Sequence, residues 1–150
     1  METSEFKLYF EKVPLLINHF IGVFPIDKLP VKIKKKQFFV ANLDPSYKEG
    51  SHWICFIRLN NTECEIFDSL GVKINNILPY ISFNQKFTFV YNSTPVQSLT
   101  STLCGKFVIT FLIERMLNQT MDFNDLLENI FVSDLSANDF NVTQFCNNLM

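Results

Sequence analysis

The sequence predicts an α+β protein in which helices flank a small mixed or antiparallel sheet and one helix is buried at the centre. Three observations predict this: two β-type runs at residues 52–59 and 63–67, a long apolar helix that begins near Cys104, and a final pair of helices. The chain has 150 residues, of which 47% are hydrophobic and 19% are charged, as is typical of a globular protein. We therefore expect one domain over residues 1–150.

The N-terminal part begins with a helix and continues in extended backbone. Residues 4–20 place apolar side chains at helical spacing, and Pro14 breaks or restarts that helix. Residues 20–30 are expected to form a turn-rich extended connection. A strand follows at residues 37–43 and is bounded by the turn residues Asp44-Pro45-Ser46.

The middle of the chain predicts a β-hairpin. Its strands are residues 52–59 and 63–67, and Asn60-Asn61-Thr62 has the composition of a hairpin turn. A short helix at residues 72–81 and a strand at residues 86–91 follow.

The central helix carries the residue of greatest chemical interest. Thr100, Ser101 and Thr102 are candidate N-caps, so the helix should begin just before Cys104. Its apolar side chains cover nearly all sides, which indicates a buried helix. A thiol in the first turn faces N–H groups and the positive end of the helix dipole, and both lower the pKa of a cysteine. Two further helices, near residues 123–131 and 138–149, complete the chain.

Four side chains combine into a candidate catalytic site. If the hairpin turns where expected, His52 at its start lies beside Asp68 or Ser69 at its end. An imidazole beside a carboxylate is what a general base and its orienting group require. Cys104 would be the nucleophile, while the Gln97 amide and the backbone N–H of Cys104 would stabilise an oxyanion.

Taken alone, each of these residues has a structural explanation. A cysteine in an apolar helix is most often a core residue, and an aspartate before Ser and Gly is most often a turn former. His52 alone suits a strand end at the surface, Gln97 an ordinary loop, and Trp53 the core. The catalytic interpretation therefore depends on Cys104, Asp68 and the others occurring together and in this order.

At these residues the sequence resembles the adenovirus-type cysteine proteases (adenain) and, more distantly, the SUMO-deconjugating proteases. The shared motifs are Gly50-Ser51-His52-Trp53, Ile66-Phe67-Asp68-Ser69-Leu70-Gly71, Val96-Gln97 and Cys104-Gly105-Lys106-Phe107. The likeness extends over most of the chain, through residues 20–24, 27–30, the strand that ends at Asn42 and the helix at residues 141–149.

The resemblance implies a cysteine endopeptidase with His52 as base, Asp68 as orienting acid, Cys104 as nucleophile and Gln97 in the oxyanion hole. Its substrates would be capsid or core precursor proteins of a DNA virus or virus-like element, cut at small or glycine-containing sites. Adenovirus enzymes usually carry Glu at the acid position, whereas Asp68 is what the SUMO proteases use. This chain is also shorter and less basic than the adenovirus enzymes.

The resemblance also bears on substrate and cofactor binding. It implies that Trp53 flanks and narrows the cleft and that Gly105 takes part in binding substrate. Adenain is activated by a viral peptide and by DNA, so both are candidate cofactors here. A DNA contact would use the only basic cluster of the sequence, Lys32, Lys34, Lys35 and Lys36, whose other interpretation is a solvated strand entrance.

The remaining thiols and imidazole predict no further site. The four cysteines show no CxxC spacing and there are two histidines, so we expect no metal. We interpret Cys55, Cys64 and Cys146 as structural and His19 as packed. The sequence shows neither a signal-peptide pattern nor an apolar run long enough to cross a membrane, so we expect an intracellular protein with reduced thiols. The resemblance places it in the host cytoplasm or nucleus, with packaging into a virion as a further expectation.

Two alternatives stay open at this point. One is a deconjugating protease for ubiquitin-like modifiers, which Asp68 and Trp53 favour. The other is a retired protease fold that serves as a binding module; such a chain should have lost one of the four site residues, and none is missing.

Overall fold

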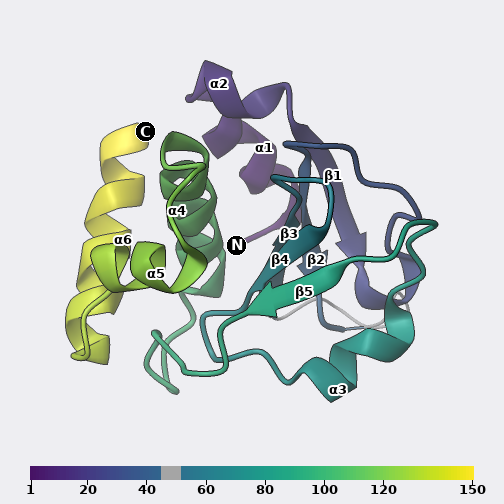
Figure 1. Cartoon of the computed structure of the whole chain (residues 1–150). Helices are drawn as coiled ribbons and strands as arrows, with labels where there is room; N and C mark the ends of the chain where they lie inside the picture. Colours follow the sequence, from purple (N-terminus) through teal and green to yellow (C-terminus); the bar gives the residue numbers. More distant parts are fainter. Residues whose placement is uncertain (45–51) are drawn as a thin grey trace.

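The computed structural model describes residues 1–44 and 52–150, and within them it shows the expected α+β fold (Figure 1). A five-stranded sheet has the order β1-β2-β3-β4-β5. Its strands are β1 (Phe20–Pro25), β2 (Phe38–Asn42), β3 (Trp53–Ile57), β4 (Glu63–Phe67) and β5 (Thr88–Tyr91). The two outer pairs are parallel and the two inner pairs are antiparallel, so the sheet is mixed.

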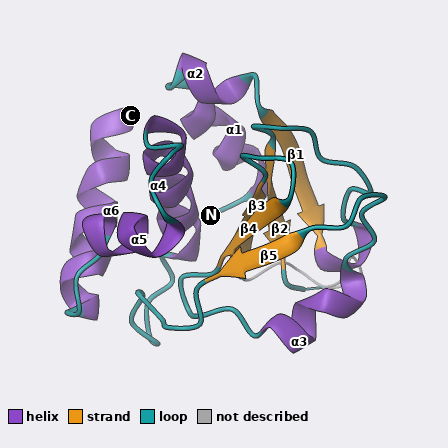
Figure 2. Cartoon of the chain, in the orientation of Figure 1, coloured by secondary structure: helices purple, strands orange, loops and turns teal. Residues whose placement is uncertain are grey.

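The longer helices lie on one side of the sheet. Helix α4 is located between the sheet and α6, packs on β3, and is therefore the buried central helix that the sequence predicts (Figures 1 and 2). The α-helices are α1 (Thr3–Glu11), α2 (Pro14–Ile17), α3 (Ile74–Ile77), α4 (Cys104–Leu117), α5 (Phe123–Ile130) and α6 (Leu135–Leu149). Short 3₁₀ turns occupy Ile26–Lys28 and Leu78–Tyr80.

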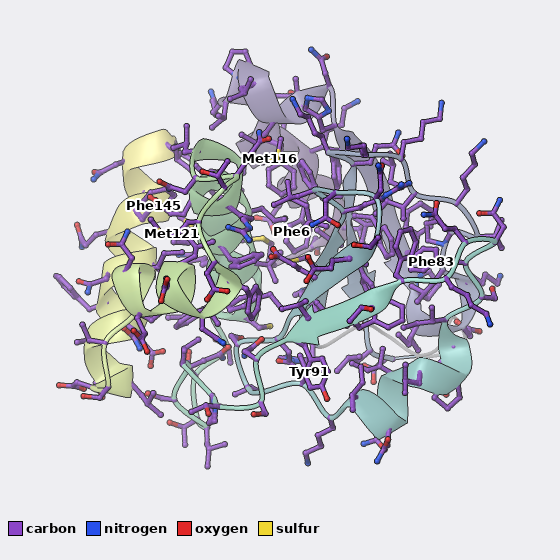
Figure 3. The ribbon with its side chains drawn as sticks, viewed as in Figure 1. Phe6, Phe83, Tyr91, Met116, Met121 and Phe145 are labelled. Atoms are coloured by element: carbon purple, nitrogen blue, oxygen red, sulfur yellow. The ribbon has the colours of Figure 1, made fainter. Side chains whose placement is uncertain are left out.

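Each face of the sheet has its own hydrophobic core. The larger core fills the space between the sheet, α1, α4 and α6, and contains stacked rings of Phe67 and Phe111 whose centroids are 4.5 Å apart. The smaller core gathers Phe39 and Phe56 with Phe83 from the loop before β5. In Figure 3, Phe6 lies between α4 and the sheet, whereas Phe83 lies on the opposite side of the sheet. Helix α4, which is apolar on nearly all sides, contacts the sheet on one side and helices on others.

A buried ion pair fastens α4 to the sheet. The guanidinium of Arg115 near the end of α4 donates from Nε to Oε1 of Glu65 in β4 at 2.8 Å and from a terminal nitrogen to Oε2. Its other terminal nitrogen donates to the backbone carbonyls of Asn118 and Met121. Because both charges are buried and bonded on several sides, the pair fixes the rotation and depth of α4 against β4.

The sequence predicted most elements, with differences of one to a few residues at their ends. The hairpin turn is confirmed, and the Asn60 side chain accepts from the backbone N–H groups of Thr62 and Glu63. The helix break at Pro14 is also confirmed. The turn at Asp44-Pro45-Ser46 falls partly outside the described residues, as do Gly50 and Ser51 of the histidine motif.

Three expectations were wrong in detail. Residues 20–25 form β1 and not a turn-rich connection, and Gly22 adopts φ of +134° where the pairing with β2 shifts register. The helix expected at residues 72–81 is one α-helical turn followed by a 3₁₀ turn that contains Pro79. The N-cap of α4 is Leu103 and none of the three hydroxyl residues before it, although Ser101 Oγ accepts from the Leu103 N–H at 3.2 Å.

Candidate active site

His52 and Asp68 form an ion-pair contact at the ends of two neighbouring strands. Nε2 of His52 lies 2.7 Å from Oδ1 of Asp68. The register of the hairpin pairs Cys55 with Phe67, so His52 just before β3 and Asp68 just after β4 meet on a diagonal and not directly opposite each other. The backbone carbonyl of His52 accepts from the Leu43 N–H, which ties this end of the hairpin to β2.

Asp68 is itself held from three sides. Its Oδ1 also accepts from the Leu70 N–H at 2.9 Å. Asn92, directly after β5, accepts from the Asp68 N–H at 3.1 Å and donates to the Asp68 carbonyl at 2.6 Å. Directly after β4 and β5, the side chain of Asn92 thus makes the two hydrogen bonds to the Asp68 backbone that a further strand residue would otherwise make. Asn92 was not predicted as a site residue, and its only signal in the sequence is a polar side chain directly after the predicted strand at residues 86–91.

Cys104 is the first residue of α4 and its side chain interacts with His52. The residue is 6% exposed. Burial raises the pKa of its thiol, but the hydrogen bond with His52, the backbone N–H of Trp53, the imidazolium charge and the backbone N–H of Gly105 together lower that pKa below its ordinary value. These contacts favour the thiolate form of Cys104.

The pKa of the His52 imidazole is shifted in the opposite direction, above its ordinary value. Burial lowers the pKa of His52, but the hydrogen bond to Asp68, the hydrogen bond to Cys104 and the two negative charges raise it from 6.5 to about 9. Since Nε2 is bonded to Asp68, Nδ1 is the ring nitrogen left for Cys104. The raised pKa of His52 and the lowered pKa of Cys104 both favour a thiolate beside an imidazolium over the neutral pair.

The other three cysteines have the electrostatics of core residues. Burial raises the pKa of Cys55 well above its ordinary value, that of Cys64 to about 12, and that of Cys146 to about 11. All four cysteines lie in the described part of the chain, and none forms a disulfide there. Cys104 is thus the one thiol of the four whose surroundings favour ionisation.

Gln97 lies in the loop between β5 and α4 and is 1% exposed. Its Nε2 donates to the carbonyl of Ser101 at 2.8 Å, and its Oε1 accepts from Ser69 Oγ. The loop is anchored to α6, because Asn138 donates to the Val96 carbonyl at 3.0 Å. Gln97 is therefore a rigidly held amide close in the chain to the start of α4. Gln97 was predicted as a site residue, whereas Ser69 was not predicted as its hydrogen-bond partner.

A cavity of about 440 Å³ borders the His52–Asp68 pair. Its walls combine apolar side chains of the smaller core with polar ones, and they include Ile26, Leu43, Leu70, Ile77, Tyr80 and Leu99. Gly71 also borders it, with φ of +90°. Leu99 is 85% exposed in the loop that carries Gln97, so an apolar side chain stands in solvent beside the candidate site.

The structure places the two expected substrate-binding residues on the side of the larger core. The Trp53 side chain is buried and meets Phe6 edge to face, with centroids 5.1 Å apart. Gly105 is buried beneath Met1: an added Cβ would meet Met1 Sδ at 2.9 Å. That Trp53 and Gly105 contact a substrate stays a prediction.

The basic cluster lies at the end of β3 opposite to His52, because the Lys36 N–H donates to the carbonyl of Arg58 directly after that strand, whereas His52 directly precedes it. Lys32, Lys34, Lys35 and Lys36 are all exposed, in the loop that leads into β2. Ile33 between them is buried, and its carbonyl accepts from Arg58 at 2.8 Å. The alternation of a buried Ile with exposed lysines fits either interpretation of this cluster.

Residues 1–44 and 52–150 contain neither a cluster of metal-ligating side chains nor a helix that could span a membrane. That part of the chain holds no group of three or more His, Cys, Asp or Glu side chains arranged to bind a metal ion. Within the same ranges, no helix has the length and hydropathy of a membrane span.

Comparison with known proteins adds little to this geometry. No protein-family model matches the sequence, and no curated protein matches it. Among solved structures, the chain is similar to the central domain of the uncharacterized Lpg1148 protein from Legionella pneumophila, at 10% identity and a TM-score of 0.43, over 87% of this chain and 88% of that one.

Proposed function

We propose that this protein is a cysteine endopeptidase with Cys104 as nucleophile, His52 as acid and base, Asp68 as the group that orients His52, and Gln97 as an oxyanion donor. One observation carries the proposal. The thiol of Cys104, the first residue of the buried helix, hydrogen-bonds to the imidazole of His52, which is itself hydrogen-bonded to the buried carboxylate of Asp68. The pKa of Cys104 is lowered, whereas the pKa of every other cysteine is raised.

The geometry supports the following reaction. The Cys104 thiolate attacks the carbonyl carbon of a peptide bond, and the new oxyanion accepts hydrogen bonds from Gln97 Nε2 and from the backbone N–H of Cys104. The carbon–nitrogen bond then breaks, and the imidazolium of His52 gives its proton to the leaving amine. Water, deprotonated by His52, hydrolyses the thioester and regenerates the thiolate and the imidazolium.

The resemblance to the adenovirus-type proteases supports the choice of substrate. We infer that the substrates are virion precursor proteins cut at small or glycine-containing sites, and that the protein acts inside the host cell. A viral peptide and DNA are the activators that the same resemblance suggests, and Lys32, Lys34, Lys35 and Lys36 are the candidate DNA contacts. The retired-module alternative is less well supported, because a module without catalysis has no need of a cysteine with a lowered pKa.

A peptide library read by mass spectrometry tests the proposal. The library holds peptides with glycine and other small residues around one bond, and it is offered to the protein with and without candidate peptide and DNA activators. We expect cleavage that disappears in Cys104→Ala and persists in Cys146→Ala, a matched control that removes a buried thiol of raised pKa. A parallel reaction with a ubiquitin-like modifier that ends in a Gly-Gly electrophile tests the deconjugating alternative. The proposal is wrong if the Cys104→Ala variant still cleaves the peptides, or if the wild-type protein cleaves none of them under any condition.

A further inference from the structure

Ser69 adjoins Asp68 directly after β4 and makes three contacts with the stretch that carries Gln97. The residue is 0% exposed. Its hydroxyl donates to Oε1 of Gln97. Its backbone carbonyl accepts from the N–H groups of both Val96 and Gln97, at 2.8 and 3.0 Å. The side chain and the backbone of Ser69 therefore hold the same glutamine.

The surroundings of Gln97 define which way its amide faces. Nε2 lies 2.8 Å from the carbonyl of Ser101, and a carbonyl can only accept a hydrogen bond. The NH₂ group must therefore face Ser101, so the amide oxygen must face Ser69. The hydroxyl of Ser69 can donate to that oxygen and does so in the structure.

This orientation has a chemical consequence. An NH₂ group has two hydrogens, and the contact with Ser101 uses one of them. The other is the hydrogen that the proposed function assigns to the oxyanion. Donation from Ser69 to the amide oxygen also polarises the amide and makes its N–H groups stronger donors.

We propose that Ser69 is a positioning residue, whose hydroxyl fixes the Gln97 amide for oxyanion stabilisation. The inference rests on the proposed function. The dipeptide Asp68-Ser69 then has a double role: the carboxylate orients His52, and the neighbouring hydroxyl orients Gln97. The base and the oxyanion donor are set by adjacent residues at the end of one strand.

Two small electrophiles test this without knowledge of the substrate. Iodoacetamide alkylates a thiolate without forming an oxyanion. With p-nitrophenyl acetate, the Cys104 sulfur bonds to the acetyl carbon through an oxyanion, the ester bond breaks, and p-nitrophenolate leaves with the electron pair. Both rates are measured at Cys104 by stopped-flow absorbance and mass spectrometry, in wild type, Ser69→Ala, Gln97→Ala and the double variant.

Ser69→Ala should slow acetylation by about 10- to 100-fold, the range for one lost hydrogen bond and a misplaced donor, and should leave the alkylation rate unchanged. In the Gln97→Ala background it should cause no further loss, because the hydroxyl acts only through that amide. Ser69→Thr, which keeps the hydroxyl, should restore much of the rate. Thr110→Val is the matched control: it removes a buried hydroxyl of α4 that donates to the Lys106 carbonyl, and should change neither rate.

The outcomes separate the two proposals. If wild-type Cys104 shows no thiolate reactivity toward iodoacetamide, the proposed function fails, and this inference falls with it. If Cys104 is reactive but Ser69→Ala acetylates at the wild-type rate, or if the losses from Ser69→Ala and Gln97→Ala are additive, the positioning role is wrong and the proposed function stands. If Ser69→Ala does not fold, Ser69→Gly takes its place with the same criteria.

Discussion

Replacing Asp68 with asparagine removes one charge from the candidate site and keeps the shape. The side-chain carbonyl oxygen of the Asp68→Asn variant can still accept from the Leu70 N–H and from His52 Nε2, as Oδ1 of Asp68 does at 2.9 and 2.7 Å. The rise of the His52 pKa from 6.5 to about 9 corresponds to roughly 3 kcal/mol of preference for the imidazolium. Among the interactions that raise this pKa, the hydrogen bond that His52 donates to Asp68 contributes most.

We therefore expect Asp68→Asn to remove about 1.5–2 kcal/mol of this preference, since a charged acceptor is about twice as strong as a neutral one. The ratio of ion pair to neutral pair should fall about 10- to 30-fold. The assay is a pH titration of the histidine ring resonances by NMR. Since the chain has two histidines, only two sets of resonances are expected. The set that disappears in a His19→Gln variant belongs to His19, so the remaining set belongs to His52.

The expected result is a His52 midpoint that moves from about 9 toward 6.5. Asp122→Asn is the control: its carboxylate caps α5, beyond the far end of α4, and the midpoint should not move. A midpoint that stays near 9 in Asp68→Asn would refute the assignment of Asp68 as the group that charges His52.

Three further predictions concern pH and stability. Above about pH 9, where His52 loses its proton, cleavage of an amide substrate should decline. Alkylation of Cys104 by iodoacetamide should continue, because it needs no proton for a leaving amine. A parallel decline of both rates would contradict this prediction. Glu65→Gln should lower the free energy of unfolding, measured in urea, by about 3–5 kcal/mol, because it leaves the guanidinium of Arg115 buried without its carboxylate. The control Glu63→Gln should lower it by less than about 1 kcal/mol. Equal losses in the two variants would count against the ion pair. Gly71→Ala should lower the free energy of unfolding by about 1–3 kcal/mol in the same assay, since φ is +90° and the new Cβ would lie 2.7 Å from the Ser93 carbonyl oxygen. In Gly105→Ala the new Cβ would meet the flexible Met1 side chain, so the loss should be smaller. A larger loss in Gly105→Ala than in Gly71→Ala would contradict this explanation.

The elements that the sequence predicted well are those with strong local signals. The Asn60-Asn61-Thr62 turn between two β-type runs defined the hairpin, and the unbroken apolar pattern after Cys104 defined a buried helix. Strand β1 was missed because Gly22, Pro25 and Pro30 are turn signals, while the stabilisation of that strand comes from parallel pairing with β2, which is not local.

The site was partly predictable for the same reason. Hairpin pairing alone brought His52 near Asp68, although the true register differs from the expected one. Single-sequence reasoning could not show that the start of α4 meets that hairpin, because the contact depends on how α4 packs against β3. Ser69 and Asn92 could not be recognised as partners of Gln97 and Asp68, since their hydrogen bonds span 28 and 24 residues.

The most direct test of the account is the alkylation rate of each cysteine against pH, followed by mass spectrometry in wild type and in His52→Ala. We expect Cys104 alone to react at mildly acidic pH and to lose this advantage without His52, because its lowered pKa depends on the imidazolium. Cys55, Cys64 and Cys146 should stay unreactive until the protein unfolds. Equal reactivity of all four thiols at about pH 8.5, or a Cys104 that keeps its reactivity in His52→Ala, would contradict the thiolate–imidazolium pair.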